Sequence, residues 1–184
     1  MDDHRRFFGY GSLVNAATHD FAGLEPARLS GWRRRWVVTP LRPVSYLSVL
    51  PDPGCAIEGA VAEVPGADWT ALDLREAAYA RVDVSGTVDP AEPGTCVYAV
   101  PDEGLLDAPG GILASYLGAV VQGFSRLHGE AAVARFFETT SGWAPLIEDL
   151  DAPVYPRAVP LEPHDIELMR EGLSAVSASC AEAP

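Results

Sequence analysis

The hydrophobic pattern of this chain changes period partway along, and this change limits the folds open to it. Up to residue 101, apolar and polar residues alternate in short segments, whereas from residue 112 onward apolar residues recur every three or four positions. Short strands followed mostly by helices are typical of an α+β fold, so we expect a small mixed sheet or barrel with helices on its outside. The expected strands cover 5–11, 27–38 (one long strand or two short ones), 44–50, 56–64, 80–88 and 96–101, and the expected helices cover 67–80, 112–127, 130–139 and 164–176.

Prolines and glycines mark the places where regular structure is expected to change. Pro51-Asp52-Pro53-Gly54 predicts a turn between two strands. The three prolines of 152–161 require an extended segment. Gly59, inside the strand expected over 56–64, suggests a bulge or a close approach by another stretch of backbone.

Composition excludes several classes of protein. A length of 184 residues fits one domain, and a net charge of −13 argues against a nucleic-acid partner. Every basic residue is Arg, so Schiff-base chemistry and a P-loop lysine are excluded. The His and Cys residues lack metal-ligand spacing, so we expect no metal site. No apolar run is long enough for a membrane span and no signal-like segment follows the N-terminus, so a cytoplasmic location with reduced thiols is expected.

The densest basic patch is Arg33-Arg34-Arg35, which lies between Trp32 and Trp36. This alternation predicts a strand with one face in water. An anion-binding role for the three arginines is the alternative.

A glycine-containing loop, Gly9-Tyr10-Gly11-Ser12-Leu13, ends the first expected strand. Glycine allows unusual backbone angles and close approach of a ligand, and successive backbone N–H groups can form an anion-binding concavity. The loop is not a dinucleotide-binding fingerprint, because Val14 occupies the position of the third glycine, and the GxSxG pattern of a nucleophile elbow is absent. A simple turn and a ligand cradle both remain open.

The helix expected over 67–80 carries a carboxylate where an apolar side chain is expected. Trp69, Leu72 and Tyr79 form its apolar stripe, and Glu76 falls on the same face, whereas Arg75 lies farther round the helix and is expected to reach water. Burial disfavours the charged form of a carboxylate and raises its pKa, as a general acid/base working near neutral pH requires. The alternative is a structural ion pair between Glu76 and an arginine such as Arg81.

Taken in order along the chain, these motifs resemble the γ-glutamylcyclotransferase-like family. The resemblance covers roughly residues 6–125 and is carried by GYGSL, the strand IEGAVAEV, the segment LDLREAAYARVDV, and VYAV. The later segment ASYLGAVVQG also looks like a helix of that family. The family often has glycine soon after its catalytic Glu, where this chain has Ala77 and Ala78.

The resemblance implies a fold, a reaction and a set of site residues. The fold is a small mixed β-barrel with flanking helices, here a single domain over 1–184 with about 141–184 as a C-terminal extension packed on it. The reaction is the cofactor-independent cyclisation of a γ-glutamyl amide, which releases 5-oxoproline. Glu76 would be the general acid/base. The substrate-binding residues would be Tyr10, Gly11, Ser12 and Leu13 in the loop, with Tyr79, Tyr98 and Tyr116 in the pocket.

Several alternatives stay open at this stage. The scaffold could instead carry a different amide-cleaving enzyme that uses Glu76, or a non-catalytic protein that binds a small molecule. Glutathione, γ-glutamyl amino acids and γ-glutamyl amines are all open as substrates, and the oligomeric state is not assigned. Arg157 or Arg81 could pair with a substrate carboxylate or with a structural partner. Residues of 141–158 could cap the pocket or form a packed tail, namely Trp143, Asp149, Asp151, Tyr155 and Arg157.

Overall fold

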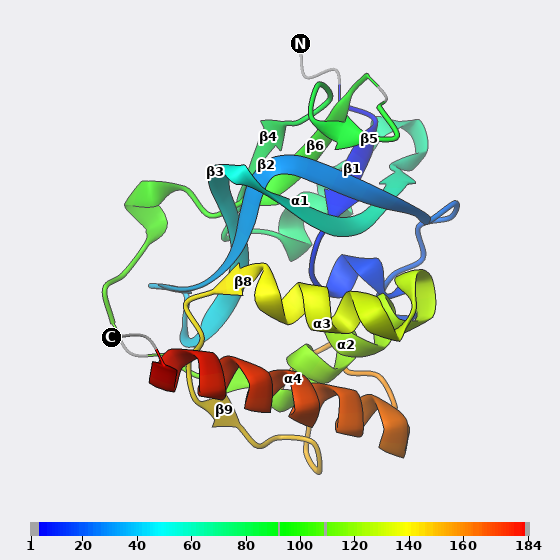
Figure 1. Cartoon of the computed structure of the whole chain (residues 1–184). Coiled ribbons are helices and arrows are strands. Elements are labelled where there is room, and N and C mark those ends of the chain that lie inside the picture. Colours follow the sequence, from blue (N-terminus) through cyan, green and yellow to red (C-terminus); the bar gives the residue numbers. More distant parts are fainter. Residues whose placement is uncertain (1–3, 92, 109, 183–184) are drawn as a thin grey trace.

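The computed structural model describes residues 4–91, 93–108 and 110–182, with side chains up to residue 178. A curled sheet forms one part of the molecule, and three helices stack beside it (Figure 1). The helices are α1 (Thr70–Arg75), α2 (Ala114–His128), α3 (Glu130–Glu138) and α4 (Pro163–Glu182). The strands are β1 (Arg6–Gly9), β2 (Glu25–Thr39), β3 (Arg42–Glu63), β4 (Ala80–Asp83), β5 (Val88–Asp89), β6 (Thr95–Ala99), β7 (Ile112–Leu113), β8 (Thr140–Ser141) and β9 (Leu146–Ile147).

The predicted mixed α+β fold is confirmed. Six strands pair in the order β4-β6-β1-β3-β2-β5, and β8 adds to β2. β1 lies parallel to β6 and antiparallel to β3. The described strands β4 and β5 lie at opposite ends of this order and do not pair with each other, so the curled sheet is a half-barrel.

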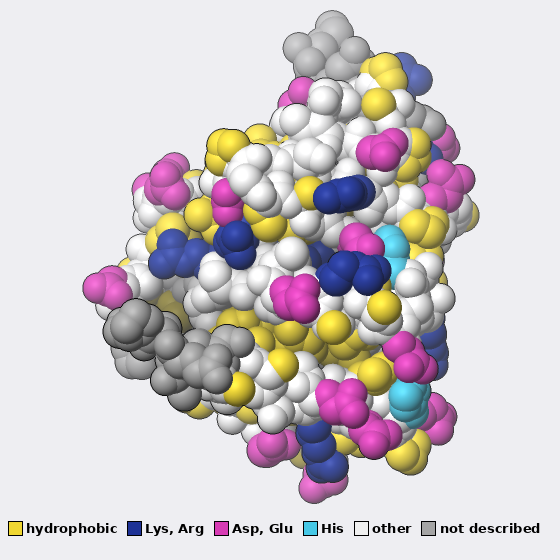
Figure 2. All heavy atoms as spheres, viewed as in Figure 1, with side chains coloured by type: hydrophobic (Ala, Val, Ile, Leu, Met, Phe, Trp, Pro, Cys, Tyr) yellow, Lys and Arg dark blue, Asp and Glu magenta, His cyan; other side chains and the backbone are white. Residues whose placement is uncertain are grey.

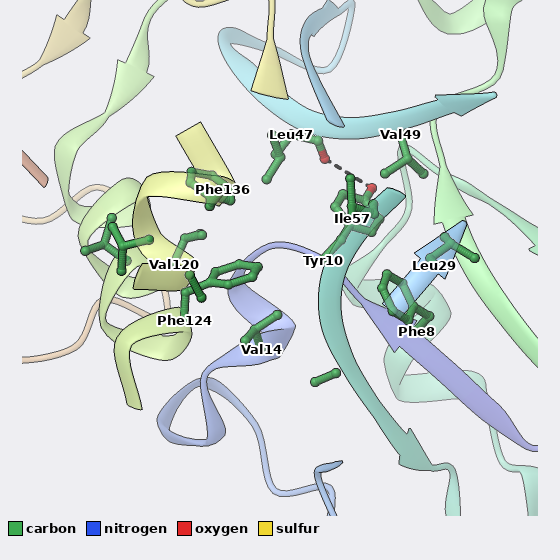
Figure 3. Close-up of a cluster of buried hydrophobic side chains, with 14 of the residues drawn as sticks. Phe8, Tyr10, Val14, Leu29, Leu47, Val49, Ile57, Val120, Phe124 and Phe136 are labelled. Atoms are coloured by element: carbon green, nitrogen blue, oxygen red, sulfur yellow. Dashed lines mark hydrogen bonds between the residues drawn. The ribbon is translucent and has the colours of Figure 1, made fainter. Parts of the chain in front are cut away.

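Alternation in β1 places apolar side chains on both faces of the sheet. Phe8 lies beside Leu29 on one face, in a large apolar cluster that extends through Ile57 to Phe124 of α2 and Phe136 of α3 (Figure 3). Phe7 packs on the other face with Trp69 and Leu72 around α1. Because helices cover both faces, β1 is buried along its whole length. Among the described helices, none is long and apolar enough to cross a membrane.

The turn predicted over 51–54 is wrong, because β3 continues through it. The hairpin reverses between Thr39 and Arg42, and Pro51 is still paired with Trp32 of β2. A register shift lies between Ser30 and Trp32, where residues 52–55 of β3 bulge out from β2. Asp52 stabilises the bulge by accepting hydrogen bonds from Arg33 Nε at 2.7 Å and from the Gly54 N–H at 3.1 Å. The proline- and glycine-rich residues therefore bend a strand without reversing it.

The helix predicted over 67–80 is much shorter in the structure. Residues 65–67 form a separate 3-10 turn in which Gly66 and Ala67 have positive φ angles. The Asp68 carboxylate then accepts a hydrogen bond from the Thr70 N–H, and α1 ends at Arg75. From Ala80 onward the backbone pairs with β6 instead, because the ladder offers hydrogen bonds that a longer helix would forfeit. The strand predicted over 80–88 likewise divides into β4 and β5.

Other predicted boundaries moved by smaller amounts. Helices at 112–127 and 130–139 are found as α2 and α3, and the helix predicted over 164–176 extends to Glu182 as α4. α4 packs on both α2 and α3. Gly172 allows this approach, because a Cβ there would overlap the ring of Phe137. That 1–184 forms one domain with an extension stays a prediction.

The arginine patch lies on β2 with one face toward water, as its alternation predicted, and its central member lies on the opposite, buried face. Arg33 and Arg35 point outward, whereas Arg34 has 0% exposure, because alternate strand residues face opposite sides. Its guanidinium lies 4.9 Å from the ring centroid of Phe124 and 5.0 Å from that of Phe136. It donates hydrogen bonds to Tyr10 O at 3.0 Å, Thr139 Oγ1 at 2.8 Å and Glu58 O. Burial lowers the pKa of Arg34 to about 9, which leaves it charged at neutral pH.

We expect Arg34→Met to lower the free energy of unfolding by about 3 kcal/mol, because it leaves buried carbonyl groups without donors. The matched control is Arg35→Met, one residue away on the exposed face, which should change stability by less than about 0.5 kcal/mol. Urea unfolding of both variants measures the difference. Equal stability of the two variants would contradict the structural role given to Arg34.

Candidate active site

The glycine loop leaves β1 through a tight 3-10 turn over Ser12–Val14. Its first backbone hydrogen bond runs from the Val14 N–H to Gly11 O at 3.0 Å. The N–H groups of Gly11, Ser12 and Leu13 precede this first donor, so the turn itself does not use them. Arg34 holds Tyr10 O, and in a trans peptide the Gly11 N–H then points the opposite way. The loop thus presents a set of backbone donors.

Two glycines are required for the packing around this loop. A Cβ on Gly59 of β3 would overlap Gly9 O and the ring of Phe8. A Cβ on Gly11 would lie 2.6 Å from the hydroxyl oxygen of Tyr116. Of the two interpretations of Gly59 left open by the sequence, a close backbone approach is therefore the one observed. At Gly11, the absence of a side chain admits the Tyr116 hydroxyl to the loop.

Buried tyrosines surround the loop and hold fixed hydrogen bonds. Tyr10 donates to Tyr98 O at 2.7 Å and contacts Leu47 O at 3.2 Å (Figure 3). Tyr79 donates to the same Leu47 O at 3.0 Å. Burial raises the pKa of Tyr10, Tyr79 and Tyr116, so all three hydroxyls stay protonated. These side chains form a rigid, largely apolar wall with hydroxyl groups at defined positions.

Glu76 lies at the C-terminal end of α1 with a side chain that is only 15% exposed. Burial raises the pKa of its carboxyl group, while the nearby charges of Arg75 and Arg157 oppose this effect. Its Oε1 atom lies 3.0 Å from Arg75 Nε. Glu76 is therefore a shielded carboxylate with one close cation, a perturbed group of the kind that marks a candidate functional site.

The ion-pair partner of Glu76 is Arg75, where the sequence suggested Arg81. Arg81 instead lies 3.3 Å from a carboxylate oxygen of Asp73 and packs over the ring of Trp69. Arg75 was expected to reach water, but its side chain is only 7% exposed. The prediction of a long helix gave both arginines the wrong surroundings, because α1 ends before Glu76 and the chain changes direction there.

Arg75 also joins the carboxylate to the glycine loop. Its guanidinium donates to Ser12 Oγ at 3.1 Å and to Thr18 O at 3.0 Å. One side chain thus contacts the loop and Glu76 together. Sequence reasoning missed this residue, since nothing in the pattern distinguished Arg75 from a surface arginine.

A cavity of about 390 Å³ opens in front of Glu76, a size suited to a small molecule. Its walls come from four parts of the chain: the glycine loop, the start of β3, the end of α1, and the junction of α2 with residues 155–157. A recess of about 30 Å³ adjoins it and shares Ser12, Glu76, Tyr79 and Tyr116 with it. The other four predicted site residues line only the recess: Tyr10, Gly11, Leu13 and Tyr98.

The eight predicted site residues therefore lie together, although they do not all face the larger cavity. Tyr98 contributes least, because its hydroxyl donates to a carboxylate oxygen of Asp73 at 2.5 Å. Leu47 and Arg42 of β3, which the sequence did not single out, complete the wall.

The C-terminal loop comprises residues 148–162. Of the five residues in 141–158 that the sequence suggested as caps of the pocket, only some lie at the cavity. Tyr155 and Arg157 line the cavity. Asp149 instead anchors the loop, accepting hydrogen bonds from the Ser115 N–H at 2.7 Å and the Ser115 hydroxyl at 2.5 Å. Trp143 stacks on Phe137 in the core, and Asp151 is exposed away from the cavity lining.

A second hollow, of about 810 Å³, lies between α3 and α4. Figure 2 shows apolar side chains exposed between these helices. The carboxylates in its lining, Glu130, Glu138 and Glu171, are exposed side chains, so this hollow offers no shielded acid/base group comparable with Glu76. Within 4–91, 93–108 and 110–182, no three His, Cys, Asp or Glu side chains are grouped so that they could hold a metal ion.

Comparison with known proteins places this arrangement among relatives of the same fold. The structure named gamma-glutamyl cyclotransferase aligns with a TM-score of 0.57 and 12% identity, covering 91% of this chain and 98% of that one. The human protein loc79017 aligns with a TM-score of 0.58 and 14% identity, covering 90% of this chain and 98% of that one. YkqA from Bacillus subtilis aligns with a TM-score of 0.52 and 20% identity, covering 75% of this chain and 56% of that one.

At these identities the structures establish the fold alone, and no curated protein matches the sequence of this chain. The family model described as gamma-glutamyl cyclotransferase, AIG2-like, matches residues 7–112. That stretch is more than half of the 184 residues, and it contains the glycine loop, β3 and Glu76. The chain therefore belongs to the AIG2-like gamma-glutamyl cyclotransferase family.

Proposed function

We propose that this protein is a γ-glutamylcyclotransferase, which converts a γ-glutamyl amide into 5-oxoproline and a free amine. The observation that carries the proposal is the position of Glu76. Its shielded carboxylate shares a small cavity with the backbone donors of the glycine loop, and Arg75 contacts both. Family membership supports the same reaction.

The reaction needs no covalent attack by the protein. The substrate's own α-amine attacks the γ-carbonyl carbon, and holding the chain folded back makes ring closure an intramolecular step. Glu76 accepts the proton that the amine loses as the new carbon–nitrogen bond forms. The original amide bond then breaks, and Glu76 returns the proton to the departing amine. Each proton taken up in the first step is thus released in the second.

The negative charge that develops on the γ-carbonyl oxygen requires hydrogen-bond donors. The N–H groups of Gly11 and Leu13 are suited to this task, because the hydrogen bonds of the 3-10 turn do not use them and Arg34 fixes the peptide before Gly11. The Ser12 N–H already contacts the Tyr116 hydroxyl. The protonated hydroxyl of Tyr116, next to Gly11, adds a further donor at the same place. The substrate's γ-glutamyl unit would occupy the recess, with its leaving half in the larger cavity.

Two other functions fit the same scaffold and are separated by product analysis. A hydrolase that uses Glu76 to activate water would release glutamate instead of 5-oxoproline. A binding protein would retain a γ-glutamyl ligand and release neither product. Incubation of the wild-type protein with glutathione, γ-glutamyl-leucine and γ-glutamyl-ε-lysine, with both products measured, distinguishes the three.

We expect Glu76→Gln to reduce 5-oxoproline release by about 10³-fold, because the amide keeps the shape of Glu76 but cannot carry the proton. The control is Glu103→Gln, an exposed carboxylate outside the cavity, which should retain full activity. Thermal unfolding and calorimetric binding of the best substrate show whether the Glu76 variant is folded and still binds. A folded Glu76→Gln protein with near wild-type activity would refute the assigned role.

We expect Arg75→Gln to move the acidic limb of the kcat/KM profile to higher pH. Arg75 lowers the pKa of Glu76, so its removal raises that pKa, and the ionised carboxylate that accepts the proton forms only at higher pH. Ser12→Ala removes one hydrogen bond of Arg75 but leaves its charge in place, so the limb of that variant should not move. An Arg75→Gln limb at or below the wild-type position would contradict the proposed coupling.

A further inference from the structure

The cavity contains positive charge that the proposed cyclisation does not use. Its charged lining consists of Glu76 and three arginines, Arg42, Arg75 and Arg157, in a protein whose net charge is −13. Arg75 is paired with Glu76. Arg42 and Arg157 form no ion pair within the part of the chain that the structure describes, and both are exposed at the cavity. Such a concentration of one sign of charge attracts an anionic ligand.

Arg157 reaches the cavity on the C-terminal loop, and that loop is held in place. Asp149 binds the N-terminal turn of α2 through Ser115 and also accepts a hydrogen bond from the Val154 N–H at 2.9 Å. The Tyr155 ring packs edge-on against Tyr116, with centroids 5.0 Å apart. The positive charge of Arg157 is close enough to Glu76 to lower the pKa of its carboxyl group.

Tyr155, two residues before Arg157 on the same loop, carries a hydroxyl donor that no described residue accepts from. Its hydroxyl oxygen is buried and has no hydrogen-bond partner among the described residues, although Tyr155 itself lines the cavity. A buried polar group without a partner costs stability unless a ligand or water satisfies it. An arginine and a tyrosine hydroxyl, two residues apart on one loop, together suit a carboxylate, which accepts several hydrogen bonds.

The remaining wall of the cavity is apolar. Leu41 and Leu74 line it with side chains that are 61% and 79% exposed, and Val44, Leu113 and Pro156 line it as well. A ligand group that fills this region would therefore carry a hydrocarbon side chain. A ligand that covers these exposed leucines removes apolar surface from water, and this burial favours binding.

We propose that Arg157, assisted by Tyr155, determines specificity by binding a carboxylate on the leaving half of the substrate. The inference rests on the proposed cyclisation and names its substrate class: γ-glutamyl amides of apolar amino acids with a free carboxylate. The part of the substrate common to all γ-glutamyl amides would be held by Tyr116 and by residues within 7–112, the stretch that matches the family model. Arg157 lies outside that stretch, on the segment that meets the variable half.

Three matched compounds test the proposal: γ-glutamyl-leucine, γ-glutamyl-leucinamide and γ-glutamyl-3-methylbutylamide. They share the scissile bond and the apolar side chain, and only the first carries the carboxylate on its leaving half. We expect wild-type kcat/KM to be roughly 10- to 100-fold higher for γ-glutamyl-leucine, the difference that a charge-assisted pair supplies. Release of 5-oxoproline measures all three.

Arg157→Gln should remove this preference, mainly by raising KM for γ-glutamyl-leucine. Because loss of Arg157 also raises the pKa of Glu76, the three compounds are compared on the pH plateau of each variant. Tyr155→Phe should act in the same direction by roughly threefold to tenfold. Arg170→Gln, on the exposed face of α4 and outside the cavity, is the control and should change nothing. An equal loss on all three compounds would overturn the proposal, since Arg157 would then bind the α-carboxylate that they share.

Binding measurements separate this inference from the proposed function. Calorimetry with Glu76→Gln, with and without Arg157→Gln, measures the affinity for the same three compounds in the absence of turnover. If the wild-type protein releases no 5-oxoproline but Glu76→Gln still prefers γ-glutamyl-leucine in an Arg157-dependent manner, the reaction is wrong and the specificity assignment stands. If Arg157→Gln does not reduce the preference for γ-glutamyl-leucine over the two carboxylate-free compounds, in binding or in turnover, the assignment is wrong.

Discussion

The rest of this structure depends on the hydrogen bonds made by the buried guanidinium of Arg34. It comes from β2, hydrogen-bonds to backbone of β3 and of the glycine loop, and contacts Thr139 at the end of α3. The rings of Phe124 and Phe136 enclose it. A charge taken out of water is tolerated only when its donors are matched, so sheet, loop and helices must meet in one arrangement around it. The orientation of the Tyr10–Gly11 peptide, and with it the donors of the candidate site, follows from that arrangement.

A second charged group, Arg75, determines how the candidate site is assembled. It holds Glu76 from one side and the glycine loop from the other, so two motifs more than sixty residues apart share one partner. Because Arg75 favours the ionised carboxylate while burial disfavours it, the two effects oppose each other at the group that would carry the proton. Burial is the larger effect, so the pKa of Glu76 is raised on balance, which agrees with the proton-transfer role proposed for it.

Sequence periodicity predicted the fold class and the long helix α2, because these depend on local pattern. The resemblance to a known family, carried by the order of the motifs, implied that the glycine loop and Glu76 belong to one site. Periodicity did not predict the end of α1, where pairing of Ala80 with β6 overrides helix periodicity. It did not indicate how deeply Arg34 is buried, and it misplaced Arg75, since an arginine is assigned to the surface unless a long-range partner is known. The bulge at 52–55 was taken for a turn because proline and glycine occur in both, and only the strand register distinguishes them.

The attachment of the C-terminal loop through Asp149 divides the candidate site into two parts. One is the cavity wall formed by the loop, and the other is Glu76 with the glycine loop. The carboxylate binds the first turn of α2, the most deeply buried helix, and in doing so stands in for a helix cap supplied from 34 residues downstream. Residues 150–157 can change between this anchor and the cavity while β1, α1 and the glycine loop keep their contacts. Short insertions and exchanges in this one loop can therefore reshape one wall of the cavity while Glu76, Arg75 and the glycine loop keep their positions.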